Sequence, residues 1–524
     1  MKSNLWKPLS FGFVVGSAAV ACGAAEEQAT RQTDSPATAV AGASVSVNVS
    51  AGGGPSGSVA AQVSGPGGVA ASMARERAGA SGSAGSSGDE GDQSTPTGAA
   101  SSPTVDPGQL PASCAEAAEA YTVSATSLDA SLVPKMASRS WAGNVLQAQA
   151  AVHPQDNRVY VGFNRSDSAV IAAEGSAPDA VISIPGAVLG GVAVTNDGVG
   201  ALLFDPNAST DMRVWAAVAR FSEDRSMRFM TDLFRSPNLE DEGTKGAPTS
   251  GRLGYIAQRD QLVAYFGHTQ RYDDGVRHQG GYLATLDAAG AQQLISGWWG
   301  SHNLDQRLLI DGDRALVLGL GDAYPEGIFY SPVQNRPRTN VLLPLASAGN
   351  GTTNGQLGGM VVSGDFIVLP FITNRSVSQD LDAGTWPDID ETIAMQIRSA
   401  AANGTDLGLL SLGRSAMPAM LEPTWLDPQL PMGARLTGLK SARYGKGELI
   451  LLLWAEATGT GRSAPAPMYF TMVIDRTGAV CQPKTPLDPM FGIGPGDDLV
   501  TRPDGAIVWG NTVGGRVQIV TLIP

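Results

Sequence analysis

The stretch GVAVTNDGVGALLFD (191–205) has the pattern of two β-strands joined by a tight turn. Apolar residues dominate on both sides of Asn196-Asp197-Gly198, and Asp-Gly between two apolar runs is a strong signal for a hairpin. The second run is the more hydrophobic and ends in Phe204 and Asp205. The stretch therefore predicts two neighbouring strands of an antiparallel sheet.

The same strand–turn–strand phrase recurs along the chain, starting about every 40 to 80 residues. The other copies occupy residues 150–164, 254–268, 306–322, 358–374, 437–456 and 497–511. Most copies are followed by a third β-rich run that closes on a turn; clear examples occupy residues 214–226, 281–291 and 468–480. Each phrase therefore accounts for three or four strands.

This repetition resembles the seven-bladed β-propellers, in which four-stranded sheets surround a central channel. The resemblance implies an all-β fold, a single propeller of seven blades within a range of six to eight, over residues 114–524. The resemblance is one of arrangement, since no Trp-Asp dipeptide marks each blade. Two β-sandwiches in tandem are the alternative, but we find no linker between residues 121 and 524. One helix is expected, in the insertion between Gln379 and Thr405.

The end of the chain predicts how the ring closes. The last run, Arg516–Ile523, is a third strand, so the final blade lacks its outer strand. Tyr121–Leu128 alternates small and apolar residues and is the expected donor of that strand. Cys114 lies just before this donor, and Cys481 follows the third strand of the preceding blade. In an exported protein these two cysteines predict a disulfide at the seam, with two buried unpaired thiols as the alternative.

The N-terminal residues MKSNLWKPLSFGFVVGSAAVAC (1–22) are typical of a targeting segment. Lys2 and Lys7 form a positive region, and the uncharged run Leu9–Ala21 is too short to span a bilayer but suits a signal peptide. The last four of these residues resemble the lipobox of bacterial lipoproteins. That resemblance implies a signal peptide over residues 1–21 and a mature chain that begins at Cys22 and carries lipid on its thiol.

Two details bear on this lipoprotein resemblance. Ala19 stands where leucine is more usual, so a conventional signal peptide with an incidental Cys22 is the alternative. Gly23 stands where an inner-membrane retention signal would carry aspartate, which favours the outer membrane in a cell that has one. The expected location is the cell envelope, with the membrane contacted through the lipid anchor only.

Residues 22–113 are expected to form a disordered tether. From Ala24 to Ser113 the chain has no Phe, Trp or Tyr and is rich in Ala, Gly, Ser, Thr and Pro. Such a composition cannot bury enough apolar surface to offset the conformational entropy of folding. Gly/Ser-rich coil of this length has a root-mean-square reach of roughly 50 Å.

The net charge of the chain limits the classes of partner that we expect it to bind. The formal net charge is −14, and no basic run interrupts it, so the sequence lacks the electrostatic signature of a nucleic-acid-binding protein. We find no phosphate-binding loop, nucleophile elbow or paired Cys-x-x-Cys motif. The expected partner is a protein or glycan ligand.

Histidine placement suggests one candidate site. Three of the four histidines fall close together, His268, His278 and His302, and Asp322 follows. In a propeller these positions map to loops or strand ends on one face, and imidazole with carboxylate suits a zinc-like divalent metal. Asp273 or Asp305 would fix the orientation of the imidazole rings by hydrogen bonding to them. The alternative is that each histidine bonds loop backbone. The nearby aromatic residues Trp298, Trp299 and Tyr324 could line a site for a sugar or peptide. The alternative is that they only pack between blades.

The expected function is that of a cell-envelope lipoprotein presenting a propeller for ligand or protein binding. The runner-up is a metal-dependent enzyme that acts on an extracellular polymer through the His/Asp group. A purely structural envelope protein is a third hypothesis.

Overall fold

A computed structural model describes most of the chain from Ala112 onward, together with Val45–Asn48. The described ranges are 45–48, 112–117, 120–129, 131–132, 134, 148–166, 168–204, 215–235, 251–271, 277–301, 303–322, 326–333, 340–343, 355–373, 406–416, 421–431, 434–458, 466–494 and 497–524. The signal peptide, Cys22, nearly all of the expected tether and the helix expected after Gln379 lie outside these ranges. None of the described helices is long and apolar enough to cross a membrane.

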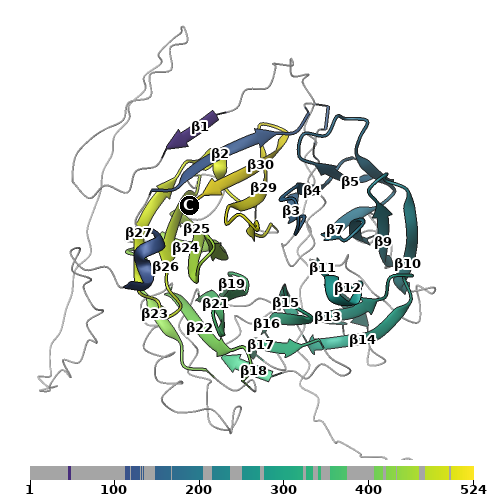
Figure 1. The fold of residues 1–524 in the computed structure, drawn as a ribbon. Coiled ribbons are helices and arrows are strands. Elements are labelled where there is room, and N and C mark those ends of the chain that lie inside the picture. Colours follow the sequence, from purple (N-terminus) through teal and green to yellow (C-terminus); the bar gives the residue numbers. More distant parts are fainter. Residues whose placement is uncertain are drawn as a thin grey trace, which may run out of the picture. The chain divides into compact units, whose positions relative to one another are not determined.

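Seven antiparallel sheets stand around a common axis, which confirms the prediction of a seven-bladed propeller (Figure 1). In every blade the first strand of the predicted phrase is innermost and the later strands lie progressively outward. The strands of the first three blades are β3 (Ala148–Val152), β4 (Val159–Asn164), β5 (Ser168–Ala173), β6 (Ile182–Pro185); β7 (Val188–Thr195), β8 (Gly198–Phe204), β9 (Trp215–Ser222), β10 (Met227–Arg235); and β11 (Gly251–Ile256), β12 (Gln261–Arg271), β13 (Arg277–Leu286), β14 (Gln292–Ser301).

The remaining four blades follow the same order. Their strands are β15 (Asn303–Asp311), β16 (Arg314–Asp322), β17 (Glu326–Pro332), β18 (Asn340–Leu343); β19 (Gly355–Leu357), β20 (Val361–Ser363), β21 (Phe366–Thr373), β22 (Asp406–Gly413), β23 (Thr424–Leu426); β24 (Ala434–Tyr444), β25 (Leu449–Thr458), β26 (Met468–Ile474), β27 (Val480–Leu487); and β28 (Val500–Thr501), β29 (Ile507–Val513), β30 (Arg516–Ile523). Short 3-10 helices are η1 (Ala112–Ala117), η2 (Ala257–Arg259) and η4 (Pro489–Phe491).

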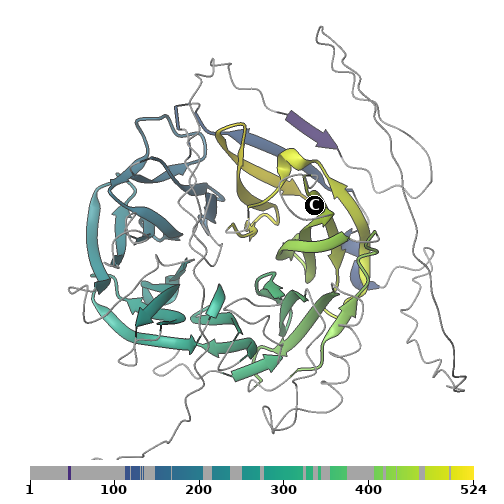
Figure 2. The same cartoon turned by 180° about the vertical axis from the view of Figure 1, so that it is seen from behind.

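The N-terminal strand β2 (Thr122–Ser127) closes the ring as predicted. It pairs antiparallel with β30 over its whole length, from Thr122 opposite Ile523 to Ser127 opposite Gln518. Both views of the ring show β2 beside β30 at the seam (Figures 1 and 2). The seventh blade is therefore built from both ends of the domain.

A further strand lies outside β2. Val45–Asn48 forms β1, which pairs with β2 from Val45 opposite Ala125 to Asn48 opposite Thr122. The four residues of β1 fall within the range expected to form the tether. Their alternation of valine with serine and asparagine favours an extended conformation, and β2 offers them an edge with free backbone groups.

The cores lie between neighbouring blades. One cluster joins Ile171 of the first blade to Leu189 and Val199 of the second, all nearly inaccessible to solvent. The approach of these two blades needs Gly162, because a Cβ there would lie 2.3 Å from Leu189 Cδ2. Each apolar strand face is thus buried against the next sheet rather than against a separate layer.

Bulges interrupt several inner strands near the axis. The inner strand of the fifth blade breaks between β19 and β20, where residues 358–360 face only two residues of β21, one of them Pro370. Proline has no N–H to donate to the inner strand, so the ladder cannot continue regularly there. In β24 the extra residue falls at Gly438, which takes the left-handed conformation with φ of 64°. Such bulges change which way the following side chains point.

Candidate ligand-binding site on the propeller axis

The seven inner strands surround a cavity of about 540 Å³ on the axis. Each blade contributes lining residues, because the innermost strand of a blade has one edge that no other strand of that blade covers. The volume is within the range of small-molecule sites, roughly 300–1,000 Å³. The axis is therefore a concave site large enough to hold a small ligand.

The two ends of the cavity differ in character. The exposed residues Pro154 and Ala257, at the C-terminal ends of inner strands, line one end. Gln149, Arg252 and Asp498, at the N-terminal ends of inner strands, line the other. Gln149 and Arg252 are buried, so we call this second end the inner end.

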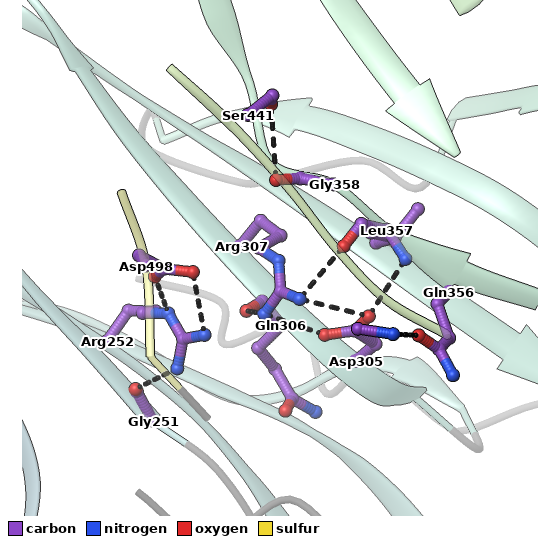
Figure 3. Close-up of polar contacts among 11 residues, drawn as sticks. Gly251, Arg252, Asp305, Gln306, Arg307, Gln356, Leu357, Gly358, Ser441 and Asp498 are labelled. Atoms are coloured by element: carbon purple, nitrogen blue, oxygen red, sulfur yellow. Dashed lines mark hydrogen bonds and ion pairs between the residues drawn. The ribbon is translucent and has the colours of Figure 1, made fainter. Parts of the chain in front are cut away.

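An ion pair crosses the axis at the inner end (Figure 3). Arg252 lies on β11 of the third blade, and Asp498 precedes β28 of the seventh, two blades that are not neighbours. The guanidinium group contacts both carboxylate oxygens, Nε with Oδ2 and Nη2 with Oδ1, the latter at 3.2 Å. Arg252 Nη1 also donates to the carbonyl oxygen of Gly251 at 2.7 Å. Two-point contact of this kind holds both side chains in one orientation.

A second pair lies beside the first on β15. Arg307 Nη1 is 2.8 Å from Asp305 Oδ1, and both side chains are more than nine-tenths buried. The same two residues bond to the backbone of Leu357 in the fifth blade. Asp305 Oδ2 accepts from the N–H of Leu357 at 3.0 Å, and Arg307 Nη2 donates to its carbonyl oxygen at 2.9 Å. Figure 3 shows both arginines side by side.

Lys440 and Asp497 complete the group of charges. Complete burial, with Arg307 and Arg252 nearby, lowers the pKa of Lys440. Burial raises the pKa of Asp497, although bonds from Ala148 and Gly494 and the charge of Lys440 favour its ionised form. The six described charged side chains at this end are three cations and three carboxylates.

The pKa of Asp498 is shifted in the opposite direction from that of Asp497. Burial acts to raise its pKa, but the charges of Arg252, Arg307 and Lys440 outweigh burial and hold the pKa at about 2. Asp498 is therefore ionised at neutral pH and is purely a hydrogen-bond acceptor. Its side chain is 25% exposed against 4% for Arg252, so the carboxylate is the more accessible member of the pair.

Side-chain oxygens at this level also tie neighbouring blades together. Gln149 Oε1 accepts from the N–H of Val192 at 3.0 Å, and Gln356 Oε1 accepts from the N–H of Gly438 at 2.6 Å. Asp497 Oδ1 accepts from the N–H of Ala148 at 3.0 Å, which joins the seventh blade to the first. These bonds satisfy backbone groups on inner-strand edges, so the polar residues at this end also stabilise the contacts between neighbouring blades.

The predicted histidine site is only partly described. His268 is opposite Gly280, and His278 is opposite Gln270, so the two histidines occupy adjacent strands, offset by two residues. Asp322 ends β16, and His302 falls between β14 and β15. The side chains of all four lie outside the described residues, and so do those of Trp298, Trp299 and Tyr324. Within the described residues no group of three or more His, Cys, Asp or Glu residues is arranged to hold a metal.

The described residues bear on two details of that expectation. The strand carrying His268 continues to Arg271, so His268 lies within β12 and does not end it. Asp305, suggested as support for the histidines, is bonded to Arg307 and to the backbone of Leu357. Because the histidine side chains lie outside the described residues, the role suggested for Asp305 stays a prediction.

Sequence reasoning missed the charged residues of the axis. Lys440 stands inside a strand phrase, and Asp497 and Asp498 open one. A charged residue inside a run expected to be buried is a usable signal for a polar cluster. It does not reveal which blades supply the partners.

Comparison with known proteins adds little beyond the fold. No protein-family model and no curated protein matches the chain. Similar solved structures include an ancestral GH74 enzyme, with 10% identity over 77% of this chain and 54% of that chain and a TM-score of 0.41. Prolyl oligopeptidase B from Galerina marginata has 11% identity, 77% and 51% coverage and a TM-score of 0.36. An α-L-arabinanase from Penicillium chrysogenum, complexed with arabinobiose, has 10% identity, 76% and 98% coverage and a TM-score of 0.35. Likeness at this level does not indicate a function.

Proposed function

We propose that this protein is a cell-envelope lipoprotein whose propeller binds a small ligand in the axial cavity. The observation that carries the binding proposal is the cavity of about 540 Å³ with buried charged groups at one end. A concave site with a few fixed polar groups is the usual form of a ligand site. The lipobox-like end at Cys22 and the Gly/Ser-rich residues that follow support a tethered position.

A ligand screen with a blocked cavity tests the binding proposal. The Cys22→Ser chain, which cannot carry the lipid, is screened against glycans, peptides and small molecules by thermal shift and calorimetry. The Met360→Trp variant fills the cavity, because Met360 lines it. Met468→Trp is the matched control, since Met468 is 56% exposed and does not line the cavity.

The two variants give opposite expectations. A genuine axial ligand loses its affinity in Met360→Trp and keeps it in Met468→Trp. If every ligand found in the screen binds both variants equally, the axial cavity is not the site. If no ligand of any class raises the melting temperature, the binding function itself is rejected.

One observation favours a second candidate, a metal-dependent enzyme acting on an extracellular polymer. The β12–β13 register places His268 and His278 on adjacent strands, offset by two residues, and imidazole nitrogens are common zinc ligands. Metal analysis of the purified chain, with and without His268→Ala and His278→Ala, tests this candidate. It fails if zinc and other divalent metals are absent from the wild-type protein after incubation with each metal.

A further inference from the structure

The charges at the inner end of the axial cavity are already balanced. Asp498 is paired with Arg252, and Asp305 with Arg307. Lys440 and Asp497 act on each other electrostatically, with neither cation nor carboxylate in excess among these residues. A charged ligand group placed here would lose its water without meeting an uncompensated opposite charge, which is unfavourable. The inner end therefore selects against a net charge.

The carboxylate of Asp498 still has capacity to accept hydrogen bonds. Each oxygen contacts Arg252 once, and an ionised carboxylate has about four acceptor positions. Asp498 is also the partly exposed member of the pair and lines the cavity. A ligand that donates an O–H or N–H can thus reach it, whereas a group that only accepts cannot bond to it.

The walls between the two ends are mostly apolar. Partly exposed aliphatic side chains from four blades line them: Val152, Leu308, Ile310, Met360, Val362 and Val500. Removing apolar ligand surface from water against these side chains is favourable. Arg443 also lines the cavity, but it is partly exposed and lies on β24 beyond Ala442, away from the inner end.

We propose that the axial cavity binds an uncharged ligand with an apolar body and one hydroxyl or amide N–H donor, which bonds to the carboxylate of Asp498. This inference rests on the proposed function and gives the chemical class of its ligand. Arg252 acts as a positioning residue, because it orients Asp498 and cancels its charge.

Four probes of equal chain length separate the possibilities. 1-Octanol carries the donor, and its isomer 1-methoxyheptane only accepts. Octanoate is the anion, and octylammonium is the cation. Calorimetry at pH 7 on the Cys22→Ser chain is expected to give 1-octanol an affinity about tenfold or more above each of the others, as expected for one hydrogen bond to a charged group.

Charge variants make the prediction sharper. In Asp498→Asn, Arg252 is left without its counter-charge, so octanoate becomes the preferred probe. In Arg252→Met, Asp498 is left alone, so octylammonium becomes the preferred probe. In the double variant Arg252→Met/Asp498→Leu, 1-octanol and 1-methoxyheptane bind equally. Replacing both members of a buried pair by apolar residues is often neutral for stability, so the double variant is the one most certain to fold.

The outcomes distinguish this inference from the proposed function. A wild-type preference for octanoate or octylammonium, or no preference at all, overturns the inference while leaving an axial site in place. So does a double variant that still prefers 1-octanol. If none of the four probes binds, the inference is also overturned, and the blocked-cavity screen then decides whether any ligand uses the axis. Probe binding that survives Met360→Trp places the probes elsewhere and counts against both.

Discussion

Cys114 and Cys481 form a disulfide bond, with their Cα atoms 5.0 Å apart and a sequence separation of 367. Cys114 lies in η1, ahead of the closing strand β2, and Cys481 lies in β27, the outer strand of the sixth blade. Two further contacts also join the N-terminal segment to the sixth blade. Gln482 Nε2 donates to the carbonyl of Ala117 at 2.9 Å, and the hydroxyls of Tyr121 and Thr471 are 2.6 Å apart. The N-terminal segment is thus fastened to the sixth blade before it joins the seventh.

Removing this disulfide is expected to destabilise the domain. The double variant Cys114→Ala/Cys481→Ala should lose about 2–4 kcal/mol in free energy of unfolding, because the bond restricts the unfolded chain and holds the seam. Urea unfolding measures the loss. A reductant should destabilise the wild type by a similar amount and leave the double variant unchanged. Equal stability of the variant and the oxidised wild type would contradict the assigned role.

A charged substitution on the buried face of the closing strand β2 should destabilise the domain. Val123 is 1% exposed and packs in the cluster that contains Leu522 and Trp509. Val123→Asp places a carboxylate in that cluster and should cost about 3 kcal/mol or more. The control is Thr126→Asp, since Thr126 is an exposed residue of the same strand. Hydrogen exchange of the β30 amides should accelerate only in Val123→Asp, and equal exchange in both variants would argue against closure by β2.

Asp311 should stabilise the contact between the fourth and fifth blades. Its carboxylate is 5% exposed and lies 2.5 Å from Nη2 of Arg314 and from Nη2 of Arg414, which follows β22. Asp311→Asn should cost about 1.5–3 kcal/mol at pH 7, the range for hydrogen bonds to charged groups. Asp313→Asn is the control, since Asp313 is 61% exposed.

The effect of Asp311 should depend on pH in a definite direction. Burial acts to raise its pKa, but bonds from Arg414 and Arg314 outweigh burial and lower the pKa from 3.8. A lowered pKa in the folded state means that the stabilisation is complete above the unfolded value and is lost as the pH falls through the folded one. The stability difference between wild type and Asp311→Asn should therefore hold from pH 7 to about pH 5 and shrink below pH 3.8. A difference that stays constant down to pH 2 would rule out the ionic contribution.

Cys22 is predicted to be the lipidated N-terminus of the mature chain. Cys22→Ser should lose fatty-acid labelling and leave the membrane fraction, because its thiol is the expected attachment point. The variant Cys114→Ala/Cys481→Ala should keep both the label and the membrane location. A Cys22→Ser chain that is still labelled would point to another anchor.

The repeated strand phrases were sufficient to predict the blades and their closure. Hairpin turns and alternating apolar runs are local signals, and copies such as 191–205 and 497–511 coincide with the first and second strands of their blades. Counting strands to the end of the chain left one missing, which identified the donor near Thr122. The disulfide followed from the same count, because both cysteines lie beside the seam.

The axial site was decided by tertiary structure alone. Arg252 and Asp498 are 246 residues apart and belong to blades that are not neighbours, so only the curvature of the closed ring brings them together. The bulges opposite Pro370 and at Gly438 change the direction of inner-strand side chains, which no period-two pattern predicts. Local pattern specifies strands because their hydrogen bonds and turns join neighbours in sequence. Contacts across the axis depend on the summed rotation of seven blades, and that sum exists only in the folded ring.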